Sequence, residues 1–568
     1  MTGRTGWILH WGLVLASICV AACAPAATNP GGTADAEAAP TAPVAKALHI
    51  ALVTEPTALG GKFGGGGTGG SDYDFIFHAQ LAQYDATGTP MPVLLARLPS
   101  LDDGSWKVYA DGTMDTTYQL RPNTTWHDGT PFTAADVQFT VASIMNPALP
   151  STNQEPEKYV GSLDVLDPQT FVVHWKEPYI FANVWALEPI PRHIFEPLAQ
   201  RDLQSFANAS AWGRDWAGLG PYQVTDWVQG SYLRGRAFQG FVLGAPKIAD
   251  LFIYFIADPS QAVAQMLAGT IDVTLGNTIR VDEGILLKEQ MEARGEASVM
   301  TIPTKIRYGE VQYRDPQAPA ARDVRVRQGM MNALDRQALV DALLRGFTTP
   351  ADVYLTPNDA AYAASDRVIA KYPFDVNRAL ALWQNAGWTR GSDGVLRNAS
   401  GERFDLEVRT TDGAQNVKEG QVLSDFWKQA GINTSLEVVP IAKQNDQEYR
   451  AKYPGVSISA TSISPDWLAK WQTSEAATEA THWKGGNRGA YSRPELDQMY
   501  RQYITTVDPQ QRNDRLVQLV KLTSEDVTYL PLYYQVDVHV IRTGLKGLVP
   551  RWPGQSGMAF NAYEWSWQ

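Results

Sequence analysis

The chain has 568 residues, of which 44% are hydrophobic and 19% charged, so it can bury more than one core and its composition excludes global disorder. Its formal net charge of −12 at pH 7 comes without a long basic run, which argues against nucleic acid as a partner. Both cysteines, Cys19 and Cys23, lie within the first 23 residues. The rest of the chain can therefore form neither an internal disulfide nor a thiolate metal site.

The first 22 residues have the features of a signal peptide. Arg4 supplies a positive charge, and residues 7–20 form an apolar run that is too short to span a bilayer comfortably. Residues 20–23, Val-Ala-Ala-Cys, resemble the lipobox of bacterial lipoproteins, in which the cysteine receives the lipid. We therefore expect a signal peptide over residues 1–22 and a lipid on Cys23. An ordinary secreted protein cut at a small residue, or an uncleaved anchor, is the alternative.

A flexible linker is expected after the lipid. Residues 24–46 are rich in alanine, proline, glycine and threonine and poor in residues that build a core. As a flexible coil this segment would reach roughly 25–30 Å. The predicted segment 23–46 would therefore let the folded body lie close to a membrane partner without rigid attachment.

Strand patterns come first in the folded part of the chain. Residues 47–56 alternate like a strand, a glycine-rich loop follows at residues 60–70, and a helix is expected near Asp72. Short alternating segments then continue to about residue 205, interleaved with turn residues.

Helical patterns dominate the second half. Residues 323–346 predict two packing helices, with Asp335 as the cap of the second and Gly346 as its left-handed stop. Asp508 and Pro509 predict the start of another helix, because a proline at the first helical position loses no hydrogen bond. Strands and helices are so mixed that the sequence indicates an α/β protein.

The sequence contains none of the common catalytic or metal-binding motifs. Its eight histidines stand at no metal-ligand spacing, and H-E-x-x-H, C-x-x-C, G-x-S-x-G and G-x-x-x-x-G-K-[ST] are all absent. We therefore expect no enzyme, no catalytic residue, no cofactor and no metal. Two carboxylates that meet only in the fold could still act as acid and base, so a secreted glycan hydrolase is an alternative.

The stretch from Thr124 to Val141 has the densest set of polar and aromatic residues, and each has a structural explanation. Asp128 and Gly129 favour a turn, and Thr133 with Asp136 predicts a capping box that opens a helix at Ala134. Trp126 and Phe132 are expected to cover the turn. His127 is expected to hydrogen-bond locally rather than to bind a metal.

The same stretch resembles the signature of a known family. Residues 117–141, "TYQLRPNTTWHDGTPFTAADVQFTV", are similar to the signature segment of the family 5 extracellular solute-binding proteins of bacterial ABC importers. Further segments resemble family steps in the same order. They are "MPVLLARLPS" (91–100), "PIPRHIFE" (189–196), "GLGPYQVTDWVQGSYLRGRAF" (218–238), "QMLAGTIDV" (265–273), "DVRVRQGMMNALDRQALV" (323–340) and "YSRPELDQMY" (491–500).

This resemblance implies the fold. It is an α/β, periplasmic-binding-protein-like two-lobed clamshell of type II, cluster C, with an additional domain inserted in the first lobe. By analogy, the first lobe comprises residues 47–90, 206–300 and 529–568. The additional domain is residues 91–205, and the second lobe is residues 301–528.

The resemblance also implies binding rather than catalysis. Family members bind solute between the lobes, close by hinge motion and deliver the solute to a membrane permease driven by a cytoplasmic ATPase. We therefore expect a monomeric, lipid-anchored extracytoplasmic protein, on the periplasmic or outer face of the cell membrane, that binds peptides or similar polar solutes. An oligosaccharide or a metal chelate as the solute, and a sensing or chaperone-like role, are alternatives.

The resemblance implies one set of binding residues. Oligopeptide binders of this family commonly hold the α-amino group of the ligand with an aspartate after a strand of the second lobe, which Asp466 matches; a buried ammonium is stable only against a carboxylate. Trp467 and Trp471 could cover ligand side chains, and Asn487 and Tyr491 fall in a region that commonly borders the cleft. Core packing of the tryptophans and a helix N-cap at Asp466 are the alternatives.

Overall fold

A computed structural model describes residues 46–60, 63, 70–146, 148–149, 156–314, 323–463, 467–555 and 557–568. The predicted signal peptide, Cys23, nearly all of the linker and Asp466 lie outside the described residues. From residue 45 onward the chain forms one compact unit.

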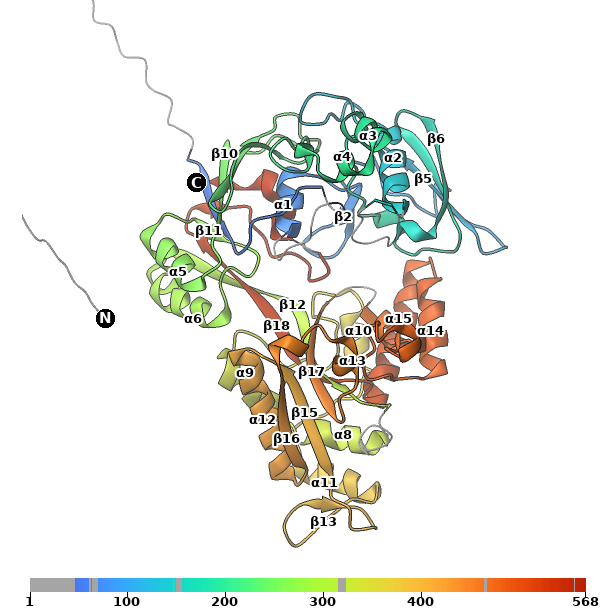
Figure 1. Cartoon of the computed structure of the whole chain (residues 1–568), viewed down its shortest axis with the longest axis vertical. Helices are drawn as coiled ribbons and strands as arrows, with labels where there is room; N and C mark the ends of the chain where they lie inside the picture. The colour runs from blue at the N-terminus through green and yellow to red at the C-terminus, as the bar shows by residue number, and fades with distance from the viewer. Residues whose placement is uncertain are drawn as a thin grey trace, which may run out of the picture. The chain divides into compact units, whose positions relative to one another are not determined.

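A ten-stranded sheet runs through both lobes in the order β16-β15-β17-β12-β18-β11-β1-β10-β9-β8. Its fourth and fifth strands, β12 (Ala297–Val311) and β18 (Leu530–Arg542), are antiparallel and longer than all the others in the sheet. Figure 1 shows them passing from one lobe to the other, and we call them the hinge strands. The register between them shifts at Pro303/Lys305 and again at Arg307/Tyr308. The predicted boundary between the lobes at residue 300 falls within β12, and the predicted boundary at residue 528 falls just before β18 begins.

The first lobe surrounds the half of the sheet that contains β1. The parallel pairs β1/β10 and β1/β11 lie next to each other, flanked by the antiparallel pairs β10/β9 and β11/β18, and the buried faces pack on α1 and on the C-terminal segment. Strand β1 lies within the strand predicted over residues 47–56, and α1 begins two residues before Asp72. The elements are β1 (Leu48–Leu52), α1 (Gly70–Phe77), β2 (Ala82–Tyr84), β3 (Pro90–Pro92), β8 (Tyr222–Val228), β9 (Tyr232–Ala237), β10 (Asp250–Phe255), α5 (Pro259–Ala268), β11 (Val273–Thr274), α6 (Val281–Gln290), β19 (Leu545–Lys546) and β20 (Ser566–Trp567).

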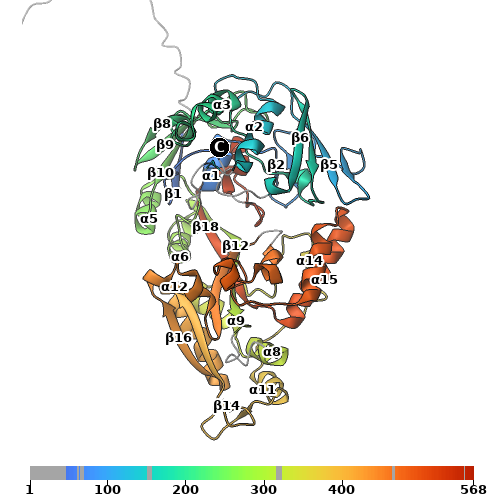
Figure 2. The same cartoon turned by 45° about the vertical axis from the view of Figure 1, so that its right-hand side comes forward.

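A separate four-stranded antiparallel sheet, in the order β4-β5-β7-β6, forms the additional domain. Its buried side packs against α2 around a core that includes Trp126, Trp175 and Trp185. Figure 2 shows this sheet beside the first lobe and on the same side of the hinge strands as α14 and α15. Its elements are β4 (Trp106–Val108), β5 (Met114–Gln119), α2 (Ala134–Met145), β6 (Val160–Asp167) and β7 (Thr170–Trp175). The next helices, α3 (Arg192–Arg201) and α4 (Leu203–Ala207), bury Phe195 and Phe206 in the core of the first lobe.

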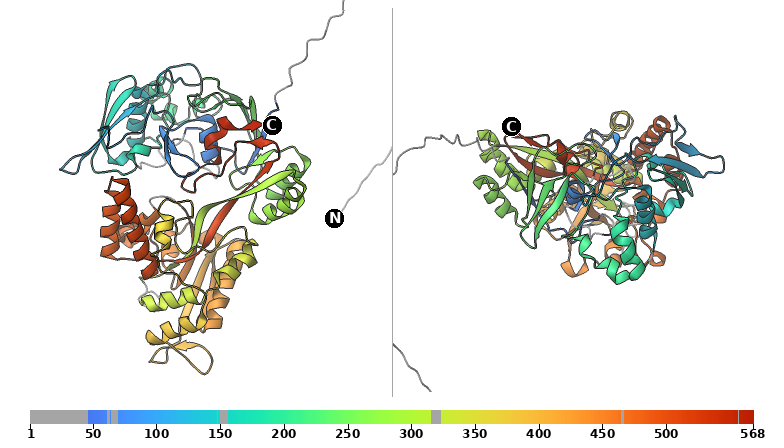
Figure 3. Two further views of the ribbon diagram at one scale, coloured as in Figure 1. Left: turned by 180° about the vertical axis from the view of Figure 1, so that it is seen from behind. Right: turned by 90° about the horizontal axis from the view of Figure 1, so that it is seen from above.

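The second lobe continues the large sheet through β17, β15 and β16, with helices packed around it. Figure 3 shows from behind that α14 and α15 lie together at one side of this lobe. Its elements are α8 (Val324–Asn332), α9 (Arg336–Leu344), α10 (Tyr362–Asp366), α11 (Val376–Asn385), β13 (Thr389–Arg390), β14 (Leu396–Arg397), β15 (Asp405–Thr411), α12 (Ala414–Ala430), β16 (Asn433–Val439), α13 (Gln447–Ala451), β17 (Val456–Ser462), α14 (Pro494–Ile504) and α15 (Pro509–Asp526). The predicted α/β clamshell with an additional domain is confirmed.

The helix starts predicted from local sequence are also confirmed. Asp335 caps α9 by accepting from the N–H of Ala338, and Asp508 caps α15 with Pro509 at its first position. At the end of α9 the left-handed cap is Arg345, with φ of 43°, and Gly346 follows with φ of 77°. The left-handed stop predicted at Gly346 therefore begins one residue earlier.

The signature stretch opens α2 at Ala134, as predicted. The Asp136 carboxylate accepts hydrogen bonds from the backbone N–H of Thr133 at 2.8 Å and from its hydroxyl at 3.0 Å. The same carboxylate accepts from the N–H of Arg192 at the start of α3 at 3.0 Å, so one side chain joins the starts of two helices. Trp126 and Phe132 are buried and pack edge to face.

His127 has a structural role, but its partners are not local. Its Nδ1 accepts from the N–H of Gly218 at 3.1 Å, and its Nε2 lies 2.9 Å from the carbonyl of Gly220. These partners are 91 and 93 residues away in the sequence, so the expectation of a local hydrogen bond was wrong. The neutral imidazole satisfies both partners, because Nε2 donates to the Gly220 carbonyl and Nδ1 accepts from the Gly218 N–H. Protonation of Nδ1 would place its new N–H against the N–H of Gly218.

Among the helices in the described part of the chain, none combines the length and apolar character that crossing a bilayer requires.

Buried histidines should make the fold sensitive to acid. Burial lowers the pKa of His127 to about 4, of His78 to about 3 and of His539 to about 4. Because the unfolded values lie near 6.5, the associated stability is complete above about pH 6.5 and is lost as pH falls toward 4. Each histidine can lower the free energy of unfolding by up to about 1.4 kcal/mol per pH unit. Denaturant titrations between pH 7 and 4 should show this loss.

The variant His127→Gln isolates one of these contributions. It should be less stable at pH 7 but lose stability less steeply with acid than the wild type. The exposed His482 has φ of 51°, which asparagine tolerates, so His482→Asn serves as the control and should keep the wild-type slope. Equal slopes for His127→Gln and the wild type would contradict the prediction.

Candidate functional site

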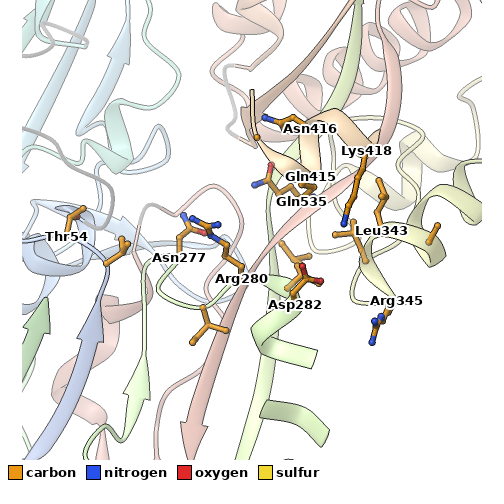
Figure 4. Close-up of a pocket in the computed structure, with 17 residues that line it drawn as sticks. Thr54, Asn277, Arg280, Asp282, Leu343, Arg345, Gln415, Asn416, Lys418 and Gln535 are labelled. Atoms are coloured by element: carbon orange, nitrogen blue, oxygen red, sulfur yellow. The ribbon is translucent and has the colours of Figure 1, made fainter. Parts of the chain in front are cut away.

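A cavity of about 620 Å³ lies beside the hinge strands, and residues of both lobes line it (Figure 4). It opens where β1 ends, where α6 and α12 begin and where α9 ends. The lining includes Val53, Thr54, Asn277, Arg280 and Asp282 from the first lobe, Leu343, Arg345, Gln415, Asn416 and Lys418 from the second, and Gln535 from β18. This is the candidate solute site.

On the first-lobe side, a tight turn places the polar residues. Gly276 and Asn277 both have left-handed backbones, with φ of 51° and 59°, which suit glycine and asparagine. The hydroxyl of Thr278 closes the turn by donating to the carbonyl of Leu275 at 2.6 Å. The chain then enters α6 with Arg280 as its N-cap, and the Arg280 side chain is exposed.

On the second-lobe side, two helix ends meet the cavity. Helix α9 ends at Leu344, so Arg345 stands at its C-terminus. Helix α12 begins after Gly413, whose φ of 136° excludes most side chains, and no side chain caps it. Lys418 follows one turn into α12 and is exposed.

A buried ion pair fixes α12 to the hinge strand β12. Arg307 donates to Glu419 through Nε at 3.2 Å and through Nη2, and Nη2 also donates to Oδ1 of Asn416 at 3.1 Å. The Glu419 side chain is fully buried, and that of Arg307 is 11% exposed. Burial alone would lower the pKa of Arg307, but attraction to Glu419 raises it above its usual value. Arg307 therefore stays charged, and its bonds to Glu419 and Asn416 hold the start of α12 at the cavity.

The geometry suits noncovalent recognition. The cavity offers side-chain amides, cations and helix ends, which bind polar groups by hydrogen bonds and charge. Among the described residues, no group of three or more histidines, cysteines or acids is placed to share a metal ion.

The four predicted site residues that the structure describes lie together in the second lobe. Trp467 and Trp471 are buried, with ring centroids 5.8 Å apart, and Trp471 approaches Tyr491 edge to face. Asn487 is fully buried and holds Tyr491 through two hydrogen bonds, to its carbonyl at 2.8 Å and from its N–H at 2.9 Å. The Tyr491 hydroxyl donates to Asp526 at 2.6 Å.

Glu310 of β12 joins the two segments that carry these residues. Its carboxylate accepts from Lys470 at 2.9 Å, between the two tryptophans in sequence, and from the N–H of Gly489 at 2.9 Å. Glu310 is almost fully buried, so this double contact fixes both segments to the hinge strand. The indole N–H groups of Trp467 and Trp471 are buried and have no acceptor among the described residues.

The residues that line the cavity beside the hinge strands, which we call the hinge cavity, were not predicted from the sequence. None of the four described site residues lines it, and contact of those four with a solute stays a prediction. One local signal was available: "DGAQNVK" (412–418) starts a helix after glycine without an acid in its first turn. That Arg280 lines the same cavity as this segment could not be predicted, because the two are far apart in the sequence.

Removing the acid of the buried pair should destabilise the protein. Glu419→Gln leaves Arg307 buried without a counterion, and we expect it to lower the free energy of unfolding by about 3–5 kcal/mol. Chemical denaturation measures the change. Glu448→Gln is the control, because it removes an ion pair with Lys452 in which both side chains are about half exposed, and it should cost less than about 1 kcal/mol. Equal costs for the two variants would contradict the role of the Arg307–Glu419 pair.

Comparison with known proteins places the chain in a family. Residues 98–480 match the family model for bacterial extracellular solute-binding proteins, family 5, middle part. The chain is 26% identical to Protein XP55 of Streptomyces lividans, over 98% of this chain and 96% of that protein. It is 25% identical to the oligopeptide-binding protein AppA of Bacillus subtilis, over 77% of this chain and 78% of that protein.

The fold also matches solved structures. That of the oligopeptide-binding protein from Thermus thermophilus, solved with a pentapeptide, has a TM-score of 0.67 and 23% identity, over 92% of this chain and 96% of that chain. The two lobes, the additional domain and the matched residues lead to one conclusion: this chain belongs to the bacterial extracellular solute-binding proteins of family 5.

Proposed function

We propose that this protein is the extracytoplasmic solute-binding component of an ABC importer, which captures peptides or similar polar solutes between its lobes and delivers them to a membrane permease. The observation that carries the proposal is the hinge cavity, because residues of both lobes line it. A solute held there touches both lobes at once. Its affinity therefore depends on how the lobes are placed.

The mechanism would be a shift in population between open and closed forms. A ligand that contacts both lobes only in the closed form binds that form more tightly than the open form. The difference between these two binding free energies sets how far the ligand shifts the population toward the closed form. Polar contacts away from the hinge also join the two sides: Trp552 Nε1 donates to Asp359 Oδ1 at 3.2 Å, and Arg512 donates to the carbonyl of Ile180 at 3.5 Å. The second contact is accompanied by apolar packing, since the buried Ile180 belongs to the same core cluster as residues of α15.

The names of two related proteins support peptides as the solute class: both are described as oligopeptide-binding. We propose that Asp466 binds the α-amino group of the peptide. The described neighbours Trp467, Trp471, Asn487 and Tyr491 would form and support the wall of that subsite, since they are buried and bonded to one another. Binding without turnover is proposed over hydrolysis of a glycan, because no catalytic motif occurs in the sequence.

A binding panel tests the proposal. Purified protein is mixed with libraries of tri- to pentapeptides, with oligosaccharides and with nickel–histidine, and binding is followed by native mass spectrometry and closure by small-angle scattering. Peptides should bind with one-to-one stoichiometry, compact the protein and be recovered intact. Turnover of a glycan, or no compaction with any peptide, would sink the proposal.

The role of Asp466 is tested within the same panel. Asp466→Ala should weaken binding of a free-amine peptide by about 3–5 kcal/mol, because a buried ammonium loses its counterion. The N-acetylated form of that peptide carries no ammonium and should lose little affinity between wild type and variant. An unchanged dissociation constant for the free amine would remove Asp466 from the site.

We also propose that a lipid on Cys23 anchors a monomeric protein to the outer face of a cell membrane, after removal of residues 1–22. The support is the lipobox-like sequence and the linker composition of residues 24–46. In cells, Cys23→Ser should move the protein from the membrane fraction to the soluble fraction, while Cys19→Ser should leave it on the membrane. Retention of Cys23→Ser on the membrane would favour an uncleaved anchor.

A further inference from the structure

A side chain of the additional domain is buried in the second lobe. Ile180 is 1% exposed and belongs to a core cluster whose other buried members all lie between Ile306 and Tyr534. Among the described residues, the core of its own domain is built from other side chains, such as Trp175. Ile180 therefore reaches from the first-lobe side into the second lobe, and its burial requires that the lobes lie together.

A short turn presents Ile180 to the second lobe. The N–H of Ala182 donates to the carbonyl of Tyr179 at 3.2 Å, and the Tyr118 hydroxyl donates to the carbonyl of Ala182 at 2.7 Å. The rings on either side of Ile180, those of Tyr179 and Phe181, meet edge to face with centroids 5.8 Å apart. The additional domain thus holds the backbone of this turn, and the side chain of Ile180 packs on the other lobe.

The surface that receives the turn is the connection between α14 and α15. Val507 lies in this connection and packs against the cores of both the second lobe and the additional domain, and Phe181 does the same from the opposite side. Arg512 of α15 donates to the carbonyl of Ile180 at 3.5 Å and to that of Val507 at 3.4 Å. One guanidinium therefore joins the turn to the connection, beside an apolar contact.

This contact lies away from the hinge strands. Figures 1 and 2 show α14 and α15 on the far side of the second lobe from α12, whose start lines the hinge cavity. Neither Ile180, Val507 nor Arg512 lines that cavity. Because points far from a hinge move farthest when it turns, a small opening of the lobes is enough to separate the contact.

We propose that the additional domain acts as a clasp: the turn at residues 179–182 buries Ile180 in the second lobe when the lobes close and exposes it when they open. Transfer of an isoleucine side chain from water into a packed apolar site is favourable. The clasp therefore favours the closed form before any solute binds. This gives the additional domain a role in closure that needs no contact with a solute in the hinge cavity.

The clasp also raises the affinity for a solute. When a solute binds only the closed form, its apparent dissociation constant is the intrinsic constant divided by the closed fraction. As long as the closed form is the minor one, a change in the ratio of closed to open protein changes the affinity by nearly the same factor. This effect on affinity rests on the proposed function, whereas the effect on the lobes does not.

The distance between the lobes tests the clasp without any solute. Spin labels are placed at Leu166→Cys on β6 and at Gln518→Cys on α15, two exposed positions on the two sides of the contact. Cys19→Ser and Cys23→Ser in the full chain keep the labels from attaching elsewhere, since these are its only cysteines. Pulsed electron paramagnetic resonance then gives the populations of short and long distances in the solute-free protein.

Three variants are compared with the wild type in this labelled form. Ile180→Ala removes most of the buried side chain, and Ile180→Asp places a carboxylate in the apolar cluster. Ile144→Ala is the matched control, because Ile144 is also 1% exposed but lies in the core of the additional domain. Chemical denaturation checks that each variant folds.

Ile180→Ala should lower the ratio of short to long distances roughly tenfold or more, as the loss of three buried carbon atoms predicts. Ile180→Asp should make the long distances predominate, because a buried carboxylate without a partner is unfavourable. Ile144→Ala should lower the stability but keep the wild-type distances. Wild-type distances in both Ile180 variants, or an equal shift in the Ile144→Ala control, would overturn the clasp.

Peptide binding gives a separate readout of the same variants. A peptide that binds the wild type should bind Ile180→Ala more weakly, by the factor by which the closed fraction falls, and should bind Ile144→Ala unchanged. An unchanged affinity of Ile180→Ala despite a smaller closed fraction would overturn the link between the clasp and affinity. If no peptide binds any form, the proposed function fails, while the distances still decide whether the additional domain is a clasp.

Discussion

The antiparallel pairing of β12 with β18 is the constraint on which the rest of the structure depends. A buried strand needs partners for its backbone N–H and C=O groups along its whole length, and this ladder supplies them from Ala297/Arg542 to Gly309/Leu530, through both lobes. Side chains at one end of the pair pack into the cores of the first lobe, and those at the other end pack into the second. Most core residues therefore belong to one lobe or the other, and the hinge strands connect the lobes, although Ile180 of the additional domain packs in a core cluster of the second lobe.

The sequence predicted features whose cause is local. Thr133 with Asp136, Asp335, and Asp508 with Pro509 mark helix starts because a cap needs only residues within one turn. The partners of His127 could not be predicted in the same way, because they lie on a strand entry more than ninety residues later. The cavity is harder still to predict from the sequence, because its lining comes from separate segments that only the sheet order brings together. These segments contribute Thr54, Arg280, Lys418 and Gln535.

The two polar regions of the second lobe differ in how their groups are used. Around Asn487 and Tyr491, side-chain amide, hydroxyl and carboxylate bond to one another, and Glu310 ties the region to β12. Because most of these polar groups already bond to one another, the network makes this region rigid and leaves few groups for hydrogen bonds to a ligand. At the hinge cavity the reverse holds, since cations and a helix end face the space. The rigid network around Asn487 and Tyr491 and the polar groups that face the hinge cavity therefore lie at separate places along the same sheet.

The register shifts in the hinge ladder give the protein a mechanical weak point in a defined position. Pro303 has no N–H to donate, and the pairing slips by one residue between Pro303 and Lys305 and again next to Arg307. These irregularities lie near the middle of β12, between its first-lobe and second-lobe ends. A bend there strains a few hydrogen bonds that are already irregular and leaves the regular pairs at both ends intact. Twisting of this short irregular part of the β12/β18 pair, rather than sliding of packed helices, would then set the angle between the lobes.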